Sequence, residues 1–245
     1  MDRRPAYNHW RRIHRLWKIK MAKTTIISLG GSIIFPDKID IAFLKKFREI
    51  ITAQIKKGSR FAIYAGGGKL ARDCQTAVSE IVGYEQESMD CIGIEATYLN
   101  ALLLRIIFKK YAEDKIIQNP TEKINLKKPI LLCSGWKPGW STDYDAVLLA
   151  KNLGVNTLIN ITNVDYVYNK NPRKYKNAKP LNEITWKGFR KLVGNKWAPG
   201  LNMPFDPVAA KEAEKSKLRV IIIGNNLHNL GNLLNGKKFK GTVIR

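Results

Sequence analysis

The chain has 245 residues, of which 44% are hydrophobic and 26% are charged. This length and composition fit one α/β domain with a full core or two tightly joined lobes, and they argue against a disordered chain. The 43 Lys and Arg residues outnumber the 20 Asp and Glu residues, so the net charge is +23. Such a charge attracts nucleotides, nucleic acid or acidic lipid headgroups, and it is equally typical of a lysine-rich solvated surface.

The three cysteines, Cys74, Cys91 and Cys133, lie far apart in the sequence and form no C-x-x-C pair. This spacing argues against a disulfide framework and against a structural zinc site. No apolar run reaches the roughly 18 residues that are needed to span a membrane. From these patterns we predict a cytoplasmic protein.

The first 22 residues differ in composition from the rest and are strongly basic. The apolar residues between Trp10 and Trp17 fall at near-helical spacing, which fits a basic amphipathic helix on a membrane surface or on nucleic acid. Met21 would be a natural start directly before the first predicted strand. We favour the simpler interpretation, a basic N-terminal extension (1–22) outside the fold, over a membrane or nucleic-acid contact.

From residue 24 onward, strand and helix patterns alternate. The expected strands are 24–29, 60–64, 116–117, 129–133, 157–162, 219–223 and 242–244. The expected helices are 41–57, 70–82, 88–111, one that ends near 153 and one that opens at Asp206, with an exposed loop over 169–182. This alternation favours a largely parallel sheet that is covered on both faces and binds ligands at the carboxyl ends of its strands.

Three predicted strands end in glycine or small polar residues and lead toward a helix: ISLGGS (27–32), YAGGGKLAR (64–72) and CSGWKPGWSTD (133–143). Glycine lets a backbone approach an anion closely, and the helix that follows offers unpaired N–H groups. One such glycine pair is usually only a tight turn, but three at one sheet edge point to two phosphorylated ligands. The absence of G-x-x-x-x-G-K-[ST] excludes a P-loop kinase, and the absence of G-x-G-x-x-G argues against a dinucleotide-binding dehydrogenase.

The motifs SLGGS, GGGKLAR, D-x-I-G-I-x-x-T-x-x-N-A, PGWSTD, ITNVDYVY and FDPVAAK follow one another in this order. From about residue 24 onward the chain resembles the amino-acid-kinase superfamily, most closely its archaeal-type uridylate kinase branch. The resemblance implies a three-layer αβα sandwich with a mainly parallel open sheet. It also implies a single kinase domain (23–245), with an acceptor-binding half (about 23–155) and an ATP-binding half (about 156–245).

By matching position, the resemblance assigns residues to three roles. The catalytic set is Gly30, Gly31, Ser32, Arg72 and Asp143. The set that binds UMP is Gly67, Asp90, Lys137, Pro138, Gly139, Trp140, Ser141, Thr142 and Asp143. The set that binds ATP is Gly30, Gly31, Ser32, Gly68, Arg72, Thr162, Asn163, Tyr168 and Asn171. No residue is assigned to a metal, because Mg²⁺ is expected to bind mainly through the nucleotide.

These assignments have simpler alternatives. Asp90, Thr142 and Asp143 also fit the starts of helices, 162–165 fits an Asx-type turn, and Tyr168 fits ordinary packing.

Four positions depart from the superfamily pattern. Tyr166 stands where Gly is usual, and Asn171 stands where Asp is usual, a change that removes one acidic contact near ATP. Ser28 stands where much of the superfamily has Lys, so we expect Lys69, Arg72 or a bound Mg²⁺ to offset the charge that develops in the reaction. Trp140 stands where His is usual, and this change bears on base selectivity.

The resemblance implies in-line transfer of a phosphoryl group from ATP to UMP, a step of pyrimidine nucleotide biosynthesis, by a homo-oligomer, a hexamer in relatives of this kind. Two alternatives stay open at this point. One is a kinase of the same fold with an isopentenyl phosphate, carbamate or amino-acid acceptor. The other is a nucleotide-binding regulator without catalysis.

Overall fold

The computed structural model describes residues 24–172, 174–194 and 204–245. The N-terminal extension predicted for 1–22 lies outside the described residues. Within the described ranges, no helix is both long enough and apolar enough to cross a membrane.

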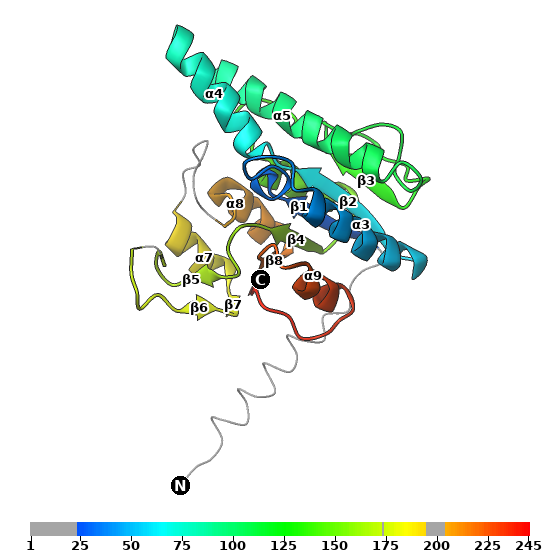
Figure 1. The fold of residues 1–245 in the computed structure, drawn as a ribbon. Helices are drawn as coiled ribbons and strands as arrows, with labels where there is room; N and C mark the ends of the chain where they lie inside the picture. The colour runs from blue at the N-terminus through cyan, green and yellow to red at the C-terminus, as the bar shows by residue number, and fades with distance from the viewer. Residues whose placement is uncertain (1–23, 173, 195–203) are drawn as a thin grey trace.

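Seven strands of the described chain form one open sheet, in the order β3-β2-β1-β4-β8-β9-β7 (Figure 1). The strands are β1 (Thr24–Leu29), β2 (Arg60–Ala65), β3 (Ile130–Cys133), β4 (Thr157–Ile161), β7 (Glu183–Ile184), β8 (Arg219–Ile223) and β9 (Thr242–Ile244). Neighbouring strands run parallel, except that β9 is antiparallel to β8. The carboxyl ends of β1, β2, β3 and β4 therefore lie at one edge of the sheet.

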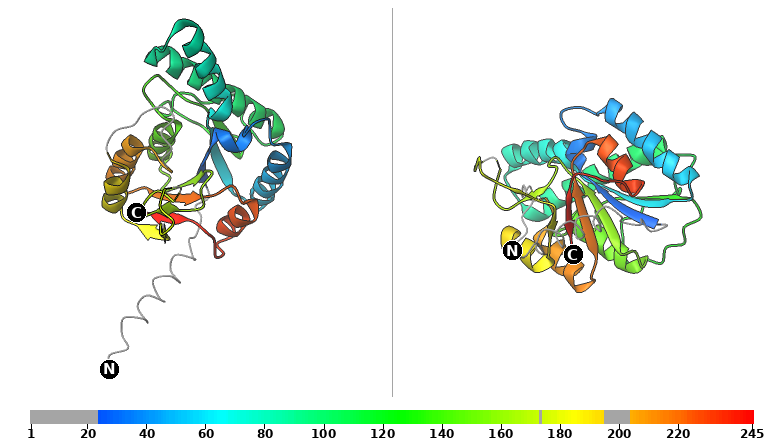
Figure 2. Two further views of the ribbon diagram at one scale, coloured as in Figure 1. Left: turned by 60° about the vertical axis from the view of Figure 1, so that its left-hand side comes forward. Right: turned by 90° about the horizontal axis from the view of Figure 1, so that it is seen from below.

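Helices cover both faces of this sheet. One face carries α2 (Gly31–Ile34), α3 (Ile41–Lys56), α5 (Gln86–Ile107) and α9 (Leu227–Leu234). The other carries α6 (Thr142–Asn152), α7 (Trp186–Val193) and α8 (Pro207–Lys215), as the left view of Figure 2 shows for α7 and α8. A further helix, α4 (Gly68–Val82), packs along α5 and projects with it beyond the sheet (Figure 1). This arrangement confirms the three-layer αβα sandwich.

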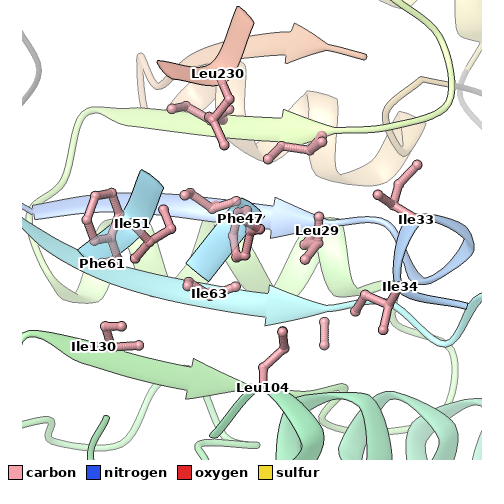
Figure 3. Packing of buried hydrophobic residues seen from close by; sticks show 14 of the residues in the cluster. Leu29, Ile33, Ile34, Phe47, Ile51, Phe61, Ile63, Leu104, Ile130 and Leu230 are labelled. Carbon is pink, nitrogen blue, oxygen red and sulfur yellow. The ribbon is translucent and has the colours of Figure 1, made fainter. Parts of the chain in front are cut away.

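The two core layers follow from the period of two along each strand. In β1, Ile27 and Leu29 face the layer of α3 and α9, whereas Ile26 faces the layer of α6 to α8. Phe47 of α3 and Leu230 of α9 point toward the strands in Figure 3 and are almost fully buried. Because both faces are covered, the central strands read as continuous apolar runs.

Several element boundaries differ from the sequence prediction. The segment 116–117 is not a strand of the sheet, because Ile117 makes only an isolated bridge to Cys133. Helix α5 begins at Gln86 and ends at Ile107, four residues before the predicted end. The loop predicted over 169–182 is closed at its base by the antiparallel pair β5 (Val167–Tyr168) and β6 (Pro180–Leu181). The short elements α2, α7, α9 and β7 were not predicted.

Candidate active site

A cleft with a volume of about 340 Å³ opens at the carboxyl edge of the sheet. Its walls come from the ends of β1, β2 and β4, from α4 and α5, and from the loop between β3 and α6. It brings together most of the residues that the motifs single out. Those that line it are Gly30, Gly31, Ser32, Gly67, Gly68, Arg72, Asp90, Lys137, Trp140, Ser141, Thr142, Asp143 and Thr162.

The glycine segments after β1 and β2 cross with their backbones in contact. A Cβ atom at Gly31 would lie 2.3 Å from the Gly68 nitrogen and 2.4 Å from the Gly66 oxygen. Gly68 itself has φ +66°, a conformation that L side chains rarely adopt. Only glycine therefore allows the first turns of α2 and α4 to lie side by side in the cleft.

Both of these helices begin without a side-chain cap. The N-cap residues are Gly30 for α2 and Gly67 for α4, and neither helix start has a side-chain hydrogen bond. By contrast, α3, α7, α8 and α9 are capped by Asp40, Thr185, Asp206 and Asn226, respectively. The first N–H groups of α4 are thus left for an anionic ligand, and the positive end of the helix dipole points the same way.

Arg72 is the cation placed between the two glycine segments. It lies one turn into α4, and its Nη2 donates to Ser32 Oγ at 3.5 Å. Lys69, the other candidate from the sequence, does not line the cleft and pairs with Asp73 at 2.5 Å. Arg72 is therefore better placed than Lys69 to stabilise charge on a transferring phosphoryl group.

Asp143 organises the floor of the cleft. Its Oδ1 accepts a hydrogen bond from Ser28 Oγ at 3.0 Å, and its Oδ2 accepts one from the Asp206 N–H at 3.2 Å. Asn160 Nδ2 lies 3.5 Å from Oδ1 and also donates to the Pro204 carbonyl at 3.0 Å. Burial, and then repulsion from the Asp206 carboxylate, raise the pKa of Asp143 to about 7. The position at which much of the superfamily has Lys is thus used here to hold an acidic group.

Residues 134–141 between β3 and α6 form the acceptor loop, which is held at several points. The Gly139 N–H donates to Asp90 Oδ2 at 2.7 Å, which ties the tip of the loop to α5. The Gly135 N–H donates to Thr97 Oγ1 at 2.7 Å. Lys137 Nζ lies 4.3 Å from the ring centre of Trp136 and 4.2 Å from that of Trp140, so the cation rests against two indoles.

Five predicted site residues lie outside the wall of the cleft. Pro138 and Gly139 belong to the exposed tip of the acceptor loop, and Asn163 is exposed directly after Thr162. Tyr168 lies in β5, where its ring meets that of Tyr166 edge to face. Asn171 is exposed in the loop between β5 and β6. The cleft therefore brings together the whole catalytic set and most of the UMP set, whereas three residues of the ATP set lie outside its wall.

Comparison with known proteins places the chain in a family. Residues 23–224 match the sequence model of the Amino acid kinase family. The chain belongs to this family. It is 37% identical over 230 residues to a uridylate kinase of Thermoplasma volcanium, which covers 91% of this chain and 98% of that protein. A uridylate kinase of Pyrococcus abyssi is 34% identical over 89% of this chain and 98% of its own length.

Solved structures agree with this membership. The crystal structure of a uridylate kinase from Archaeoglobus fulgidus matches with a TM-score of 0.78 and 30% identity, over 90% of this chain and 99% of that one. An aspartate kinase from Synechocystis shares the fold at 14% identity, with a TM-score of 0.69, over 90% of this chain and 39% of that one. The resemblance inferred from the six motifs is confirmed.

From the sequence, no role was assigned to several buried polar residues at the site. Asn100 donates to the Gly66 carbonyl at 2.8 Å and to the Gly67 carbonyl at 3.3 Å, and it fixes the second glycine segment. Asp206 was expected only as the cap of α8, yet it also accepts a hydrogen bond from Ser141 and lines the cleft. Asn100 and Thr97 stand three residues apart in one motif, a spacing that puts both on the same side of a helix.

The acidic side chains at the site make hydrogen bonds within the protein. In the part of this kinase-family chain that the structure describes, no group of three or more His, Cys, Asp or Glu side chains converges to hold an ion. The nearby carboxylates Asp143 and Asp206 already accept hydrogen bonds from the protein.

Proposed function

We propose that this protein is a uridylate kinase, which transfers the γ-phosphoryl group of ATP to UMP and so serves pyrimidine nucleotide biosynthesis. The observation that carries the proposal is the likeness, at 31–37% identity over about nine tenths of the chain, to archaeal proteins named uridylate kinase. The cleft supports it, because two uncapped helix starts and Arg72 meet the acceptor loop there.

The proposal keeps the residue roles that the resemblance to the family implies. Gly67, Asp90 and the acceptor loop with Ser141, Thr142 and Asp143 would bind UMP. Gly30, Gly31 and Ser32 would line the transferring phosphoryl group, with Gly68 and Arg72 between the two phosphate sites. Thr162, Asn163, Tyr168 and Asn171 would hold ATP.

The reaction needs little covalent help from the protein. An ionised phosphate oxygen of UMP forms a bond to the γ-phosphorus while the bond from that phosphorus to the leaving ADP oxygen breaks, so no general base is required. The N–H groups of the glycine segments and the Arg72 guanidinium stabilise the charge that spreads over the transferring group. When bound together with ATP, Mg²⁺ would neutralise part of the charge on the phosphates.

The same proposal includes the wider setting. We propose two functional halves in one domain, with the acceptor bound by about 23–155 and ATP by about 156–245. We also propose a homo-oligomer, a hexamer, that acts in the cytoplasm.

A coupled assay of ADP release tests the proposal. The purified chain receives Mg-ATP with UMP, CMP, AMP, glutamate, carbamate or isopentenyl phosphate in turn. We expect release that strongly prefers UMP. Release with a different preferred acceptor would assign the chain to another kinase of the same fold. A folded protein that binds ATP but releases ADP with none of the acceptors would refute the kinase proposal.

A further inference from the structure

A second buried carboxyl group, Asp145, lies beneath the acceptor loop. It belongs to the first turn of α6, its side chain is fully buried, and it does not line the cleft. Its Oδ2 accepts a hydrogen bond from the Trp136 N–H at 3.1 Å. Its Oδ1 has no hydrogen-bond partner among the described residues. One oxygen of this carboxyl group therefore holds the acceptor loop, and the other is buried without a hydrogen-bond partner.

The surroundings of Asp145 are polar but incompletely paired. Within the described chain, the hydroxyl group of Tyr64 on β2 is also buried without a hydrogen-bond partner. The Asp145 carboxylate raises the pKa values of Tyr64 and Cys133, whose own burial is the larger cause, so these groups lie within electrostatic reach of one another. Buried polar atoms of this kind cost free energy when unpaired, and a cluster of them calls for an explanation.

Several charged or titratable groups act on Asp145 from the elements around it. Burial raises its pKa to about 7; the Trp136 N–H and the Lys137 ammonium oppose that shift, and the Asp206 carboxylate adds to it. The Asp145 charge also contributes to the raised pKa of Tyr144, its neighbour on α6, for which burial is the largest cause. The carboxyl group is thus poised to change its charge near neutral pH.

The hydrogen bond to Trp136 connects Asp145 with the surface that receives the acceptor. The Trp136 ring meets that of Trp140 edge to face, with ring centres 5.0 Å apart. Lys137 rests against both rings, and both Lys137 and Trp140 line the cleft. The loop is therefore tied at its base to the Asp145 carboxylate and at its tip to that of Asp90.

We propose that Asp145 is a positioning residue for the acceptor. Its ionised carboxylate holds the Trp136 N–H and so keeps Lys137 and Trp140 in the arrangement that receives UMP, and its protonation loosens that hold. The proposal rests on the proposed function for the identity of the acceptor. A charged acceptor makes a stronger hydrogen bond than a neutral one and also attracts the Lys137 ammonium. Binding of the acceptor should therefore weaken as the pH falls through neutrality.

The kinetic test compares three variants of the full chain. At pH 8, Asp145→Asn should raise KM for UMP about tenfold and Asp145→Ala by more, with kcat and KM for ATP within about twofold of the original values. Between pH 8 and pH 6, the KM for UMP should rise more in the unaltered protein than in Asp145→Asn. The UMP phosphate titrates equally in both proteins, so the difference reports the protonation of Asp145. Tyr64→Phe removes a neighbouring hydroxyl but leaves the hydrogen bond between Asp145 and Trp136, so this variant should keep the original KM for UMP.

A second measurement needs no substrate and so separates this proposal from the assignment of the function. Hydrogen exchange in a peptide that spans 134–140 should show about tenfold less protection of the Trp136 amide in Asp145→Ala than in Tyr64→Phe at the same pH. Equal protection in the two variants would overturn the proposal, whatever the preferred acceptor. A folded Asp145→Ala that keeps the KM for UMP, or that raises the KM values for UMP and ATP alike, would overturn it as well.

Discussion

Replacement of Gly31 by alanine tests whether the two glycine segments must touch. A Cβ at this position would lie 2.3 Å from the Gly68 nitrogen, 2.4 Å from the Gly66 oxygen and 2.5 Å from the Gly67 carbonyl carbon. Non-bonded heavy atoms pack at about 3.5 Å or more, so the two segments would have to separate by about 1 Å. All three neighbours are backbone atoms, and no rotation of a side chain can relieve the overlap.

This separation would move the start of α2 away from the start of α4, where we place the two phosphate sites. A displacement of about 1 Å between reacting groups lowers a rate by about 100-fold, so Gly31→Ala should lower kcat for UMP phosphorylation by that factor. The strain should also lower the free energy of unfolding by about 1–3 kcal/mol. The coupled ADP assay and urea denaturation measure the two effects.

Gly231→Ala is the matched control for this experiment. Gly231 lies within α9, and a Cβ there would meet no heavy atom within 4 Å. Alanine favours a helix interior over glycine by about 0.5–1 kcal/mol, so this variant should be slightly more stable and fully active. If Gly31→Ala kept kcat within about threefold and unfolded like the original protein, the crossing of the backbones would not matter and the reasoning would be wrong.

Three further predictions concern charge and packing. Because burial raises the pKa of Asp143 to about 7, the folded state holds this proton more tightly than the unfolded state. The contribution of Asp143 to the free energy of unfolding should therefore fall as the pH rises from about 4 to about 7, by up to about 1.4 kcal/mol per pH unit. In urea denaturation at several pH values, Asp143→Asn should weaken this pH dependence, and the part that Asp145 causes should remain. Trp186→Phe removes the hydrogen bond from the buried indole to the Leu218 carbonyl at 2.9 Å. It should lower the free energy of unfolding in urea by about 1–3 kcal/mol. A loss below about 0.5 kcal/mol would mean that water replaces this hydrogen bond. Arg72→Ala should lower kcat at least about 100-fold, whereas Asp90→Ala should mainly raise KM for UMP; the opposite pattern in steady-state kinetics would exchange their roles.

Most of the fold could be predicted from the sequence, because the patterns that indicate its strands and helices are local. The β-branched runs of β1, β2 and β4 and the amphipathic pattern of α3 each occupy one continuous segment. Their alternation alone indicates a parallel sheet with helices on both faces. The ends of α5 and the short elements α2, α7, α9 and β7 were not predicted well, because packing against the sheet decides short elements more than propensity does.

The motifs likewise identified the family and named most of the residues that line the cleft. A motif states which residues are present, and the order of strands then brings their ends to one edge of the sheet. Ser28, by contrast, could be recognised only as a departure from the superfamily pattern. Its hydrogen bond to Asp143 joins two positions that are 115 residues apart.

Tertiary structure alone decided the electrostatics of the site. In the sequence, Asp206 was expected only as a helix cap, Asp143 was assigned to the site only by the resemblance, and Asp145 received no role. Their pKa values rise because packing of the fold removes much of the water around the three carboxyl groups and because the Asp206 carboxylate repels the other two. Burial and the distance between charges belong to the packed molecule, so the sequence determined which groups are available and the fold determined what their protons do.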